Sequence, residues 1–422
     1  MKNGLKIKLP PRKQRLVYYQ IYLIFFMYWL KDVLHFPSAI TYLTDVITIY
    51  LFITRIKSIS RNIKASGAKR QLNIFGIILG CIIIGALLNF VDPLLFIWGL
   101  RNNIRFFAFF FICLTLLYDS DLDRIFRFIT VMFWMNVVMS SFQYFVMGVS
   151  GDYLGGFFGV TQGCNTYVNI LICFISSFVL SQYFHKKTSL LNMGVTVVAC
   201  LYLATLAELK IFYVEFIVIF LVAILIQKPT LKTGAFIISG VIMMIVGVQV
   251  ILEYNPEILN FFFNQNAVEF YLSGNGYTNS GDLNRFTAIQ QIYEKFFEGD
   301  FFHSIFGFGL GNCEYAQFSF LQSDFYLKYS YLHYRWFTHA WVYLEQGALG
   351  IILLVVFFVS IALFAIKNKN ISQRPELMMT SILFLPTCFI GLIYNSALQM
   401  ESAYIIALIC AIPFILYKNK KI

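Results

Sequence analysis

The chain has 422 residues, of which 59% are hydrophobic and only 13% are charged, and its formal net charge is +11. A soluble protein carries about a quarter charged residues, so this composition excludes an ordinary soluble enzyme. It also excludes a nucleic-acid-binding protein, because most basic residues fall in short loops between apolar runs and not in one basic patch.

Runs of about twenty apolar residues recur along the chain, and each is long enough to cross ~30 Å of hydrocarbon. They predict an all-α polytopic membrane protein, in which residues 1–422 form a single integral membrane domain with about 12 transmembrane helices. The expected spans are Val17–Leu34, Ser38–Thr54, Asn73–Val91, Asn102–Tyr118, Ile125–Val149, Cys164–Phe184, two within Leu190–Gln227, Thr233–Tyr254, Gly347–Ile366, Leu377–Asn395 and Ser402–Tyr417. The eight cysteines lie mostly inside these runs, so no metal site or disulfide framework is predicted.

The distribution of basic residues predicts the orientation, since loops rich in Lys and Arg stay in the cytoplasm. Both termini are then cytoplasmic, and residues 253–337 form one large extracytoplasmic loop. Eight of the 32 Lys and Arg residues lie on the outer side: Lys31, Arg101, Arg105, Lys210, Arg285, Lys295, Lys328 and Arg335. Membrane insertion does not require these eight cations, so they are the first candidates for binding an anion.

Arg101 and Arg105 lie one helical turn apart at the outer end of the fourth span. Two interpretations stay open for this pair. The side chains bind an anionic substrate, or they extend to the phosphates of the surrounding lipid.

Lys210 lies within an apolar segment, Leu190–Gln227, that would be ~57 Å long as one helix, too long for a single crossing. The segment must therefore fold back, and its polar interruption contains Glu208, Lys210 and Glu215. Charges inside a membrane segment are costly unless they are paired or face water, which favours a functional role. A local salt bridge that closes the hairpin is the alternative.

The large loop carries three further features. A predicted amphipathic helix over Asn284–Glu298, capped by Asp282 or Asn284, would lie on the membrane surface with Arg285 in its first turn. Gly307, Gly309 and Gly311 predict a turn that brings the backbone close to a ligand or to the core. His339 follows at the start of the next span, and Glu345 lies within the next two turns. A lone histidine at this place is more often structural, so a structural and a functional role both stay open for His339.

Together, Arg285, the glycine steps at 307–311, His339 and the run Glu345–Gln346–Gly347–Ala348–Leu349–Gly350 resemble the bacterial O-antigen polymerase and ligase superfamily. The glycine turn at 155–159 and the position of Lys210 are also similar to that family. The resemblance covers roughly residues 151–350. It implies a fold like that of the class C glycosyltransferases, in which many spans accompany one large external loop that carries amphipathic helices.

The resemblance implies that the protein is a metal-independent and cofactor-independent enzyme of the bacterial inner membrane, with its site at the extracytoplasmic face. Its substrates would be polyprenyl-diphosphate-linked oligosaccharides, and membrane lipid and a chain-length regulator are further candidate partners. The expected reaction extends O-antigen or capsule repeat units; transfer of finished glycan by a ligase, or transport by a flippase, are the alternatives. Expected roles follow from charge: Lys210 and Arg285 stabilise the diphosphate leaving group, and His339 serves as general base with Glu345 as its orienting partner or replacement. The remaining candidates for substrate binding are Arg101, Arg105, Glu208, Gly309 and Gly311.

Overall fold

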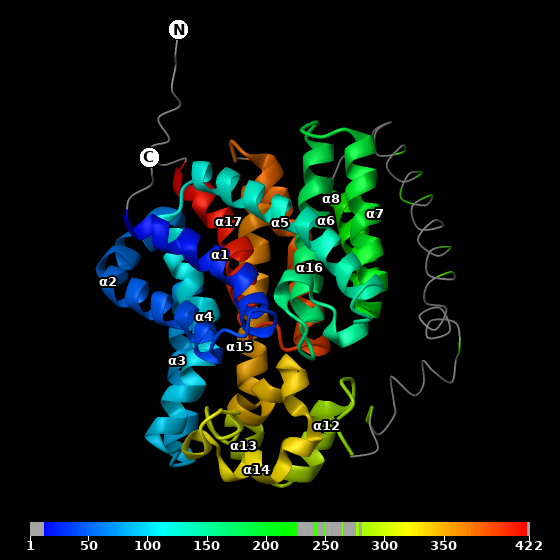
Figure 1. Ribbon diagram of the computed structural model, residues 1–422. Coiled ribbons are helices and arrows are strands. Elements are labelled where there is room, and N and C mark those ends of the chain that lie inside the picture. Colours follow the sequence, from blue (N-terminus) through cyan, green and yellow to red (C-terminus); the bar gives the residue numbers. More distant parts are fainter. Residues whose placement is uncertain are drawn as a thin grey trace.

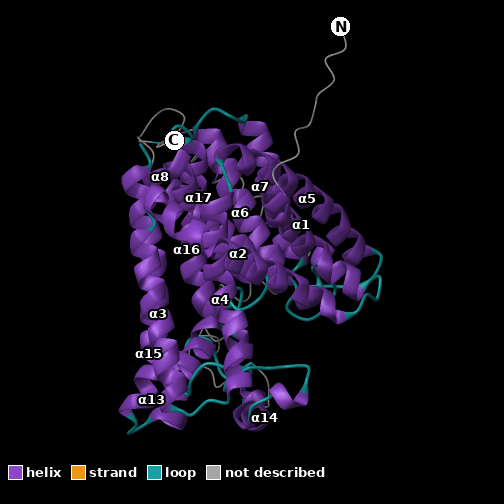
Figure 2. Ribbon diagram, turned by 90° about the vertical axis from the view of Figure 1, so that its left-hand side faces the viewer, coloured by secondary structure: helices purple, strands orange, loops and turns teal. Residues whose placement is uncertain are grey.

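The computed structural model describes residues 12–226, 281–370 and 372–419, with isolated positions between 234 and 277. The described part is built from helices joined by short turns, shown in Figures 1 and 2. The longer helices are α1 (Arg12–Asp32), α2 (Tyr42–Ser66), α3 (Lys69–Leu88), α4 (Pro93–Leu116), α5 (Asp119–Phe145), α6 (Asn165–Phe184), α7 (Leu190–Leu206), α8 (Lys210–Ile226), α15 (Thr338–Asn368), α16 (Pro375–Tyr394) and α17 (Ala403–Asn419). Short helices α12 (Ala288–Ile292), α13 (Phe301–Phe306) and α14 (Asp324–Tyr329) lie between α8 and α15.

Seven helices of the described chain are long and apolar enough to cross a membrane, and they confirm the predicted class of polytopic helical membrane protein. They correspond to the predicted spans two to six, ten and eleven, with ends that differ by several residues. Two of the other predicted spans match shorter apolar helices, α7 and α17. The predicted ninth span, Thr233–Tyr254, lies outside the described residues, so the count of 12 stays a prediction.

The core of the bundle is aromatic. α4 packs between α2 and α17, and α6 packs against α7, α8 and α16. From Phe106 to Leu116 every residue of α4 is buried, and rings such as Phe110 meet Phe357 of α15 and Phe414 of α17 edge to face. This packing holds the polar upstream turns of α4, which carry Arg101 and Arg105, in a fixed position.

The turn between α7 and α8 confirms that Leu190–Gln227 folds back on itself. α7 ends at Leu206, and α8 begins at Lys210. Glu208, between the two helices, has a left-handed backbone (φ 53°), which is uncommon for a residue with a side chain.

The three short helices lie at the end of the molecule opposite to the last turn of α17, as Figure 1 shows. The predicted amphipathic helix over Asn284–Glu298 is shorter than expected: α12 covers only Ala288–Ile292 and a π-helical turn, Tyr293–Phe297, follows. Ala288, Ile292 and Phe297 are buried in a second apolar cluster with Trp341 and Leu344 of α15. The helix was predicted to lie on the membrane surface, but its inner face packs against α15.

α13 docks onto α15 at a break in that helix. Gly347 has non-helical angles (φ 63°, ψ −166°), and a Cβ atom there would lie 2.2 Å from the carbonyl of Ile305. Gly307 shows the reciprocal constraint, because its Cβ would lie 2.5 Å from the carbonyl carbon of Glu345. Two glycines are therefore required where the backbones cross.

We expect Gly347→Ala to detach α13 from α15, since the added methyl group collides with backbone atoms and the left-handed conformation disfavours alanine. The expected result is faster proteolysis between residues 298 and 337 together with a lower melting temperature. Limited proteolysis in detergent measures the first effect. Gly80→Ala is the matched control, because a Cβ on Gly80 of α3 has no neighbour within 4 Å. Equal proteolysis of the two variants would contradict the role of the crossing.

Candidate functional site

A polar cavity of about 1040 Å³ lies where α1, α4, the α7–α8 turn and the segments around α15 and α16 converge. Six of the eight cations that the sequence predicts for the outer side line it: Lys31, Arg101, Arg105, Lys210, Arg285 and Arg335. Three carboxylates line it as well, those of Asp152, Glu208 and Glu401. The lining is therefore basic on balance, and the structure brings together cations that are far apart in the sequence.

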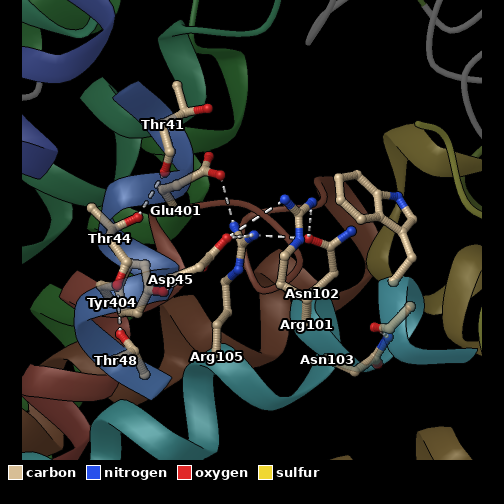
Figure 3. A network of polar contacts seen from close by, with 12 residues as sticks. Thr41, Thr44, Asp45, Thr48, Arg101, Asn102, Asn103, Arg105, Glu401 and Tyr404 are labelled. Carbon is tan, nitrogen blue, oxygen red and sulfur yellow. Dashed lines mark hydrogen bonds and ion pairs between the residues drawn. The ribbon is translucent and has the colours of Figure 1, made fainter. Parts of the chain in front are cut away.

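Arg105 forms the centre of a buried ion network, drawn in Figure 3. Its side chain is 2% exposed and lies 3.2 Å from Asp45 of α2 and 2.9 Å from Glu401, just before α17. Tyr404 donates a hydrogen bond to the second oxygen of Asp45. Two carboxylates thus compensate the charge of Arg105, which makes it a structural cation first and a substrate ligand only second.

Arg101 is held more loosely than Arg105. Its guanidinium carbon lies 3.9 Å from the ring centroid of Trp98, and its Nη1 lies 3.6 Å from the carboxylate of Asp45. It also donates to Asn102. Among the described residues, Nε and Nη1 of Arg101 have no hydrogen-bond partner, whereas in Arg105 only Nε lacks one. Arg101 therefore has more hydrogen-bonding capacity left for a ligand than Arg105.

Glu401 is a fixed anion in the cavity wall. The hydroxyls of Tyr28 and Tyr167 donate to one of its oxygens, and Arg105 pairs with the other. Burial alone would raise the pKa of Glu401, but Arg105 and the tyrosine hydrogen bonds bring this pKa below its ordinary value. An ionised carboxylate held by these partners is a weak base.

The α7–α8 turn supplies Lys210 and Glu208 to the cavity. The backbone N–H of Lys210 donates to the Glu208 carbonyl, and the Glu208 carboxylate approaches Gly151, where a Cβ would lie 3.4 Å from it. The glycine loop before α6 thus contacts the turn. Asn165 of α6 joins the two by donating to Asp152 and to the Ala207 carbonyl.

Arg285 enters the cavity through an aromatic box. Its guanidinium carbon lies 4.0 Å from the ring centroid of Tyr394, 4.8 Å from that of Tyr277 and 5.4 Å from that of Phe337. Rings at these distances hold a guanidinium by cation–π attraction and fix its plane. The Asn284 side chain accepts from the N–H of Phe286, but this contact forms a turn before α12, whose N-cap is Thr287, so Asn284 and Asp282 are not the predicted helix cap.

His339 is not among the residues that line the cavity, so its role as general base stays a prediction and gains no support from the cavity. Its ring is buried, and its two nitrogens lie 2.8 Å from the carbonyl oxygen of Arg285 and 3.1 Å from that of Leu392. Both nitrogens face backbone acceptors, so neither faces a sugar hydroxyl. His339 instead fastens the Arg285 backbone to α15 and α16, which makes it a positioning residue.

We expect His339→Gln to retain most of the activity, because a glutamine amide can donate to the Arg285 carbonyl, whereas His339→Ala loses that contact and displaces Arg285. The measurement is the pH profile of turnover for both variants. A positioning role predicts the wild-type profile for His339→Gln. Loss of the acidic limb of the profile in His339→Gln would restore the imidazole as the base.

Glu345, Gly309 and Gly311 also lie outside the cavity lining, and of the two predictions for the glycine turn, approach to a ligand or to the core, the geometry agrees with the second. One oxygen of Glu345 accepts from the backbone N–H groups of Gly311 and Cys313. Cβ atoms on Gly309 and Gly311 would lie 2.5 Å from Val91 and 2.1 Å from the Leu95 carbonyl. The glycine steps bring the backbone close to the protein core, and the carboxylate of Glu345 holds them there.

The sequence interpretation gave no role to Arg335 or Trp341. Arg335 lies over the rings of Trp341 (4.5 Å) and Tyr315 (5.3 Å), and both it and Trp341 line the cavity. The indole N–H of Trp341 and Nε of Arg335 have no hydrogen-bond partner. The clue in the sequence was the position of Arg335 among the eight outer cations.

Glu314 lies behind this wall and accepts a hydrogen bond from Asn102. Burial raises the pKa of Glu314 to about 7, although the nearby Arg335 acts in the opposite direction. The charge of this carboxyl therefore depends on pH close to neutrality, and with it the field that acts on Arg335 and Arg101.

The arrangement defines a membrane protein with a basic cavity that is lined by aromatic side chains from helices and loops. Donor-only groups such as guanidinium and ammonium bind ligands rich in oxygen acceptors and negative charge. Tyrosine and tryptophan faces bind the apolar faces of rings. A scan against protein-family models finds no match for the chain, and a search of the curated proteins finds none either.

Proposed function

We propose that the protein is a glycosyltransferase that polymerises repeat units of a bacterial surface polysaccharide, O-antigen or capsule. It transfers glycan from a polyprenyl-diphosphate-linked donor to a sugar hydroxyl of a lipid-linked acceptor at the extracytoplasmic face of the inner membrane. The observation that carries the proposal is that Lys210, Arg285 and Arg101, from three distant segments of the chain, line one cavity.

The cavity fits a ligand with a charged and a sugar part. Its volume of about 1040 Å³ is at the upper end of small-molecule sites, which are ~300–1,000 Å³. Cations bind the diphosphate and stabilise the negative charge that grows on it as the bond to the sugar breaks. Aromatic side chains such as Trp98, Tyr315 and Trp336 line the same space and offer faces for sugar rings.

In the proposed step, the acceptor hydroxyl oxygen forms a bond to the anomeric carbon of the donor. The bond from that carbon to the phosphate oxygen breaks, and polyprenyl diphosphate leaves with the electron pair. We assign Lys210 and Arg285 to the leaving diphosphate, and Arg101 to binding of the same diphosphate in the donor. We assign the hydroxyl proton to Glu208, which lines the cavity in the same turn as Lys210. The donor supplies the free energy, so the step uses no nucleotide.

The test uses the full-length protein in membrane vesicles that contain purified lipid-linked repeat units. Chains of increasing length on polyprenol support a polymerase. Transfer of glycan to a different acceptor would replace the proposal by a ligase, and movement of the lipid-linked unit without new glycosidic bonds by a flippase. Glu208→Gln is expected to abolish extension while leaving donor binding intact, and undiminished extension would refute its role as base.

A further inference from the structure

A buried carboxyl group lies inside the helix bundle, apart from the residues of the proposed reaction. Glu215 of α8 is 1% exposed and lies in the bundle beside α6 and α16. One of its oxygens, Oε2, accepts from Asn169 Nδ2 at 2.8 Å and from Cys173 Sγ at 3.2 Å. Within the described chain, no Lys, Arg or His side chain forms an ion pair with Glu215.

Two buried acceptors at this point lack donors. Among the residues that the structure describes, Oε1 of Glu215 and Oδ1 of Asn169 have no hydrogen-bond partner, although the two side chains already share one hydrogen bond. An ionised carboxylate without a counter-charge in a bundle of apolar helices is costly, and so is each unsatisfied acceptor. One proton on Oε1 removes the charge and supplies the missing donor. A carboxylic acid and a carboxamide then pair through two complementary hydrogen bonds.

The groups around Glu215 favour a proton over a metal cation as its ligand. The titratable groups that face Glu215 are neutral thiols: Cys173 of α6 and Cys388 of α16, with Cys200 of α7 beyond Cys173. Thr387 of α16 and Ser176 of α6 are buried hydroxyl groups beside Cys173 and Cys200. A sulfur and an amide nitrogen already occupy Oε2, and neither is a ligand for a hard metal cation.

Asn169 connects this group to the cavity, because its side chain both lines the cavity and contacts Glu215. α8 also begins at Lys210, which lines the same cavity. We propose that Glu215 is a proton-binding site inside the membrane bundle, which exchanges its proton with the polar cavity at Asn169. α8 thereby links the state of this site to the position of Lys210, and the proposal does not depend on the reaction proposed above.

The test is labelling with dicyclohexylcarbodiimide, an apolar reagent that modifies protonated carboxyl groups, on the full-length protein in proteoliposomes. Peptide mapping by mass spectrometry is expected to find an adduct on Glu215 that decreases as pH rises, and none in Glu215→Gln. Glu401 is the internal control, because it is also buried but is paired with Arg105. Labelling of other carboxyls with none on Glu215 at any pH would overturn the proposal.

Two further experiments distinguish a proton site from a metal-cation site and test the exchange through Asn169. Suppression of the adduct by Na⁺ at constant pH would show a metal-cation site and refute a proton site. Asn169→Leu removes the polar contact with the cavity, so the adduct on Glu215 is expected to respond several-fold more slowly to a pH jump. An unchanged response would refute exchange through Asn169, and recovery of the wild-type rate by Asn169→Gln would support it.

Discussion

Lys210→Ala and Arg285→Ala are each expected to lower the rate of glycan chain extension by ~10²-fold or more, because each removes a donor that stabilises the leaving diphosphate. The protein should still insert and fold, since neither side chain belongs to the buried network of Arg105. The measurement is the initial rate of extension in vesicles at saturating donor. A loss in turnover at an unchanged Michaelis constant would identify a contact made in the transition state.

The chain provides matched controls for these two variants. Lys295 and Lys328 are also predicted outer cations of the large loop, but they do not line the cavity, and Lys295 donates to Tyr331 near the surface. Lys295→Ala and Lys328→Ala should extend glycan at the wild-type rate. If all four variants were equally slow, general loss of positive charge would explain the result, and if all four were fully active, the proposed mechanism would be wrong.

Asp45→Ala is expected to destabilise the protein by about 3–5 kcal/mol, the usual cost of removing one partner from a buried ion pair. Asp45 is 4% exposed and lies within ion-pair distance of both Arg101 and Arg105. Its removal leaves Glu401 as the single carboxylate beside Arg105 and leaves the Tyr404 hydroxyl without its acceptor. Thermal unfolding in detergent measures the effect as a lower melting temperature.

Asp123→Ala is the control for the stability experiment. Asp123 makes a two-pronged contact with Arg374, but its side chain is 49% exposed, so its loss should cost no more than ~1 kcal/mol. A smaller shift in melting temperature for Asp45→Ala than for Asp123→Ala would show that the network in Figure 3 does not stabilise the fold.

The class of protein was predictable because the apolar runs and the charges of the loops can be read from the sequence alone. The shared cavity was approached by one physical argument, that cations unnecessary for insertion must have another use. Lys210 and Arg285 both follow from it. Arg335 could have followed from the same argument but lacked a second feature that singled it out.

The roles of His339 and Glu345 could not be predicted, because their partners are backbone groups. Every residue other than proline has the same backbone N–H and carbonyl groups, so the sequence does not show which of them a side chain contacts. This holds for the carbonyls of Arg285 and Leu392 and for the N–H groups of Gly311 and Cys313. From the sequence alone, a polar residue near a predicted site can therefore either take part in the reaction or hold the backbone in position. Glu215 illustrates the converse, since it was noted only as a polar interruption of the hairpin.

The ion network around Arg105 also bears on how the protein matures. Asp45 and Arg105 are 60 residues apart in the sequence, whereas Glu401 follows much later, so the ribosome adds it long after the other two. A nascent chain that does not yet include α17 therefore carries Arg105 with only one of its two carboxylate partners. The network can be completed only after the segment around α17 has been inserted.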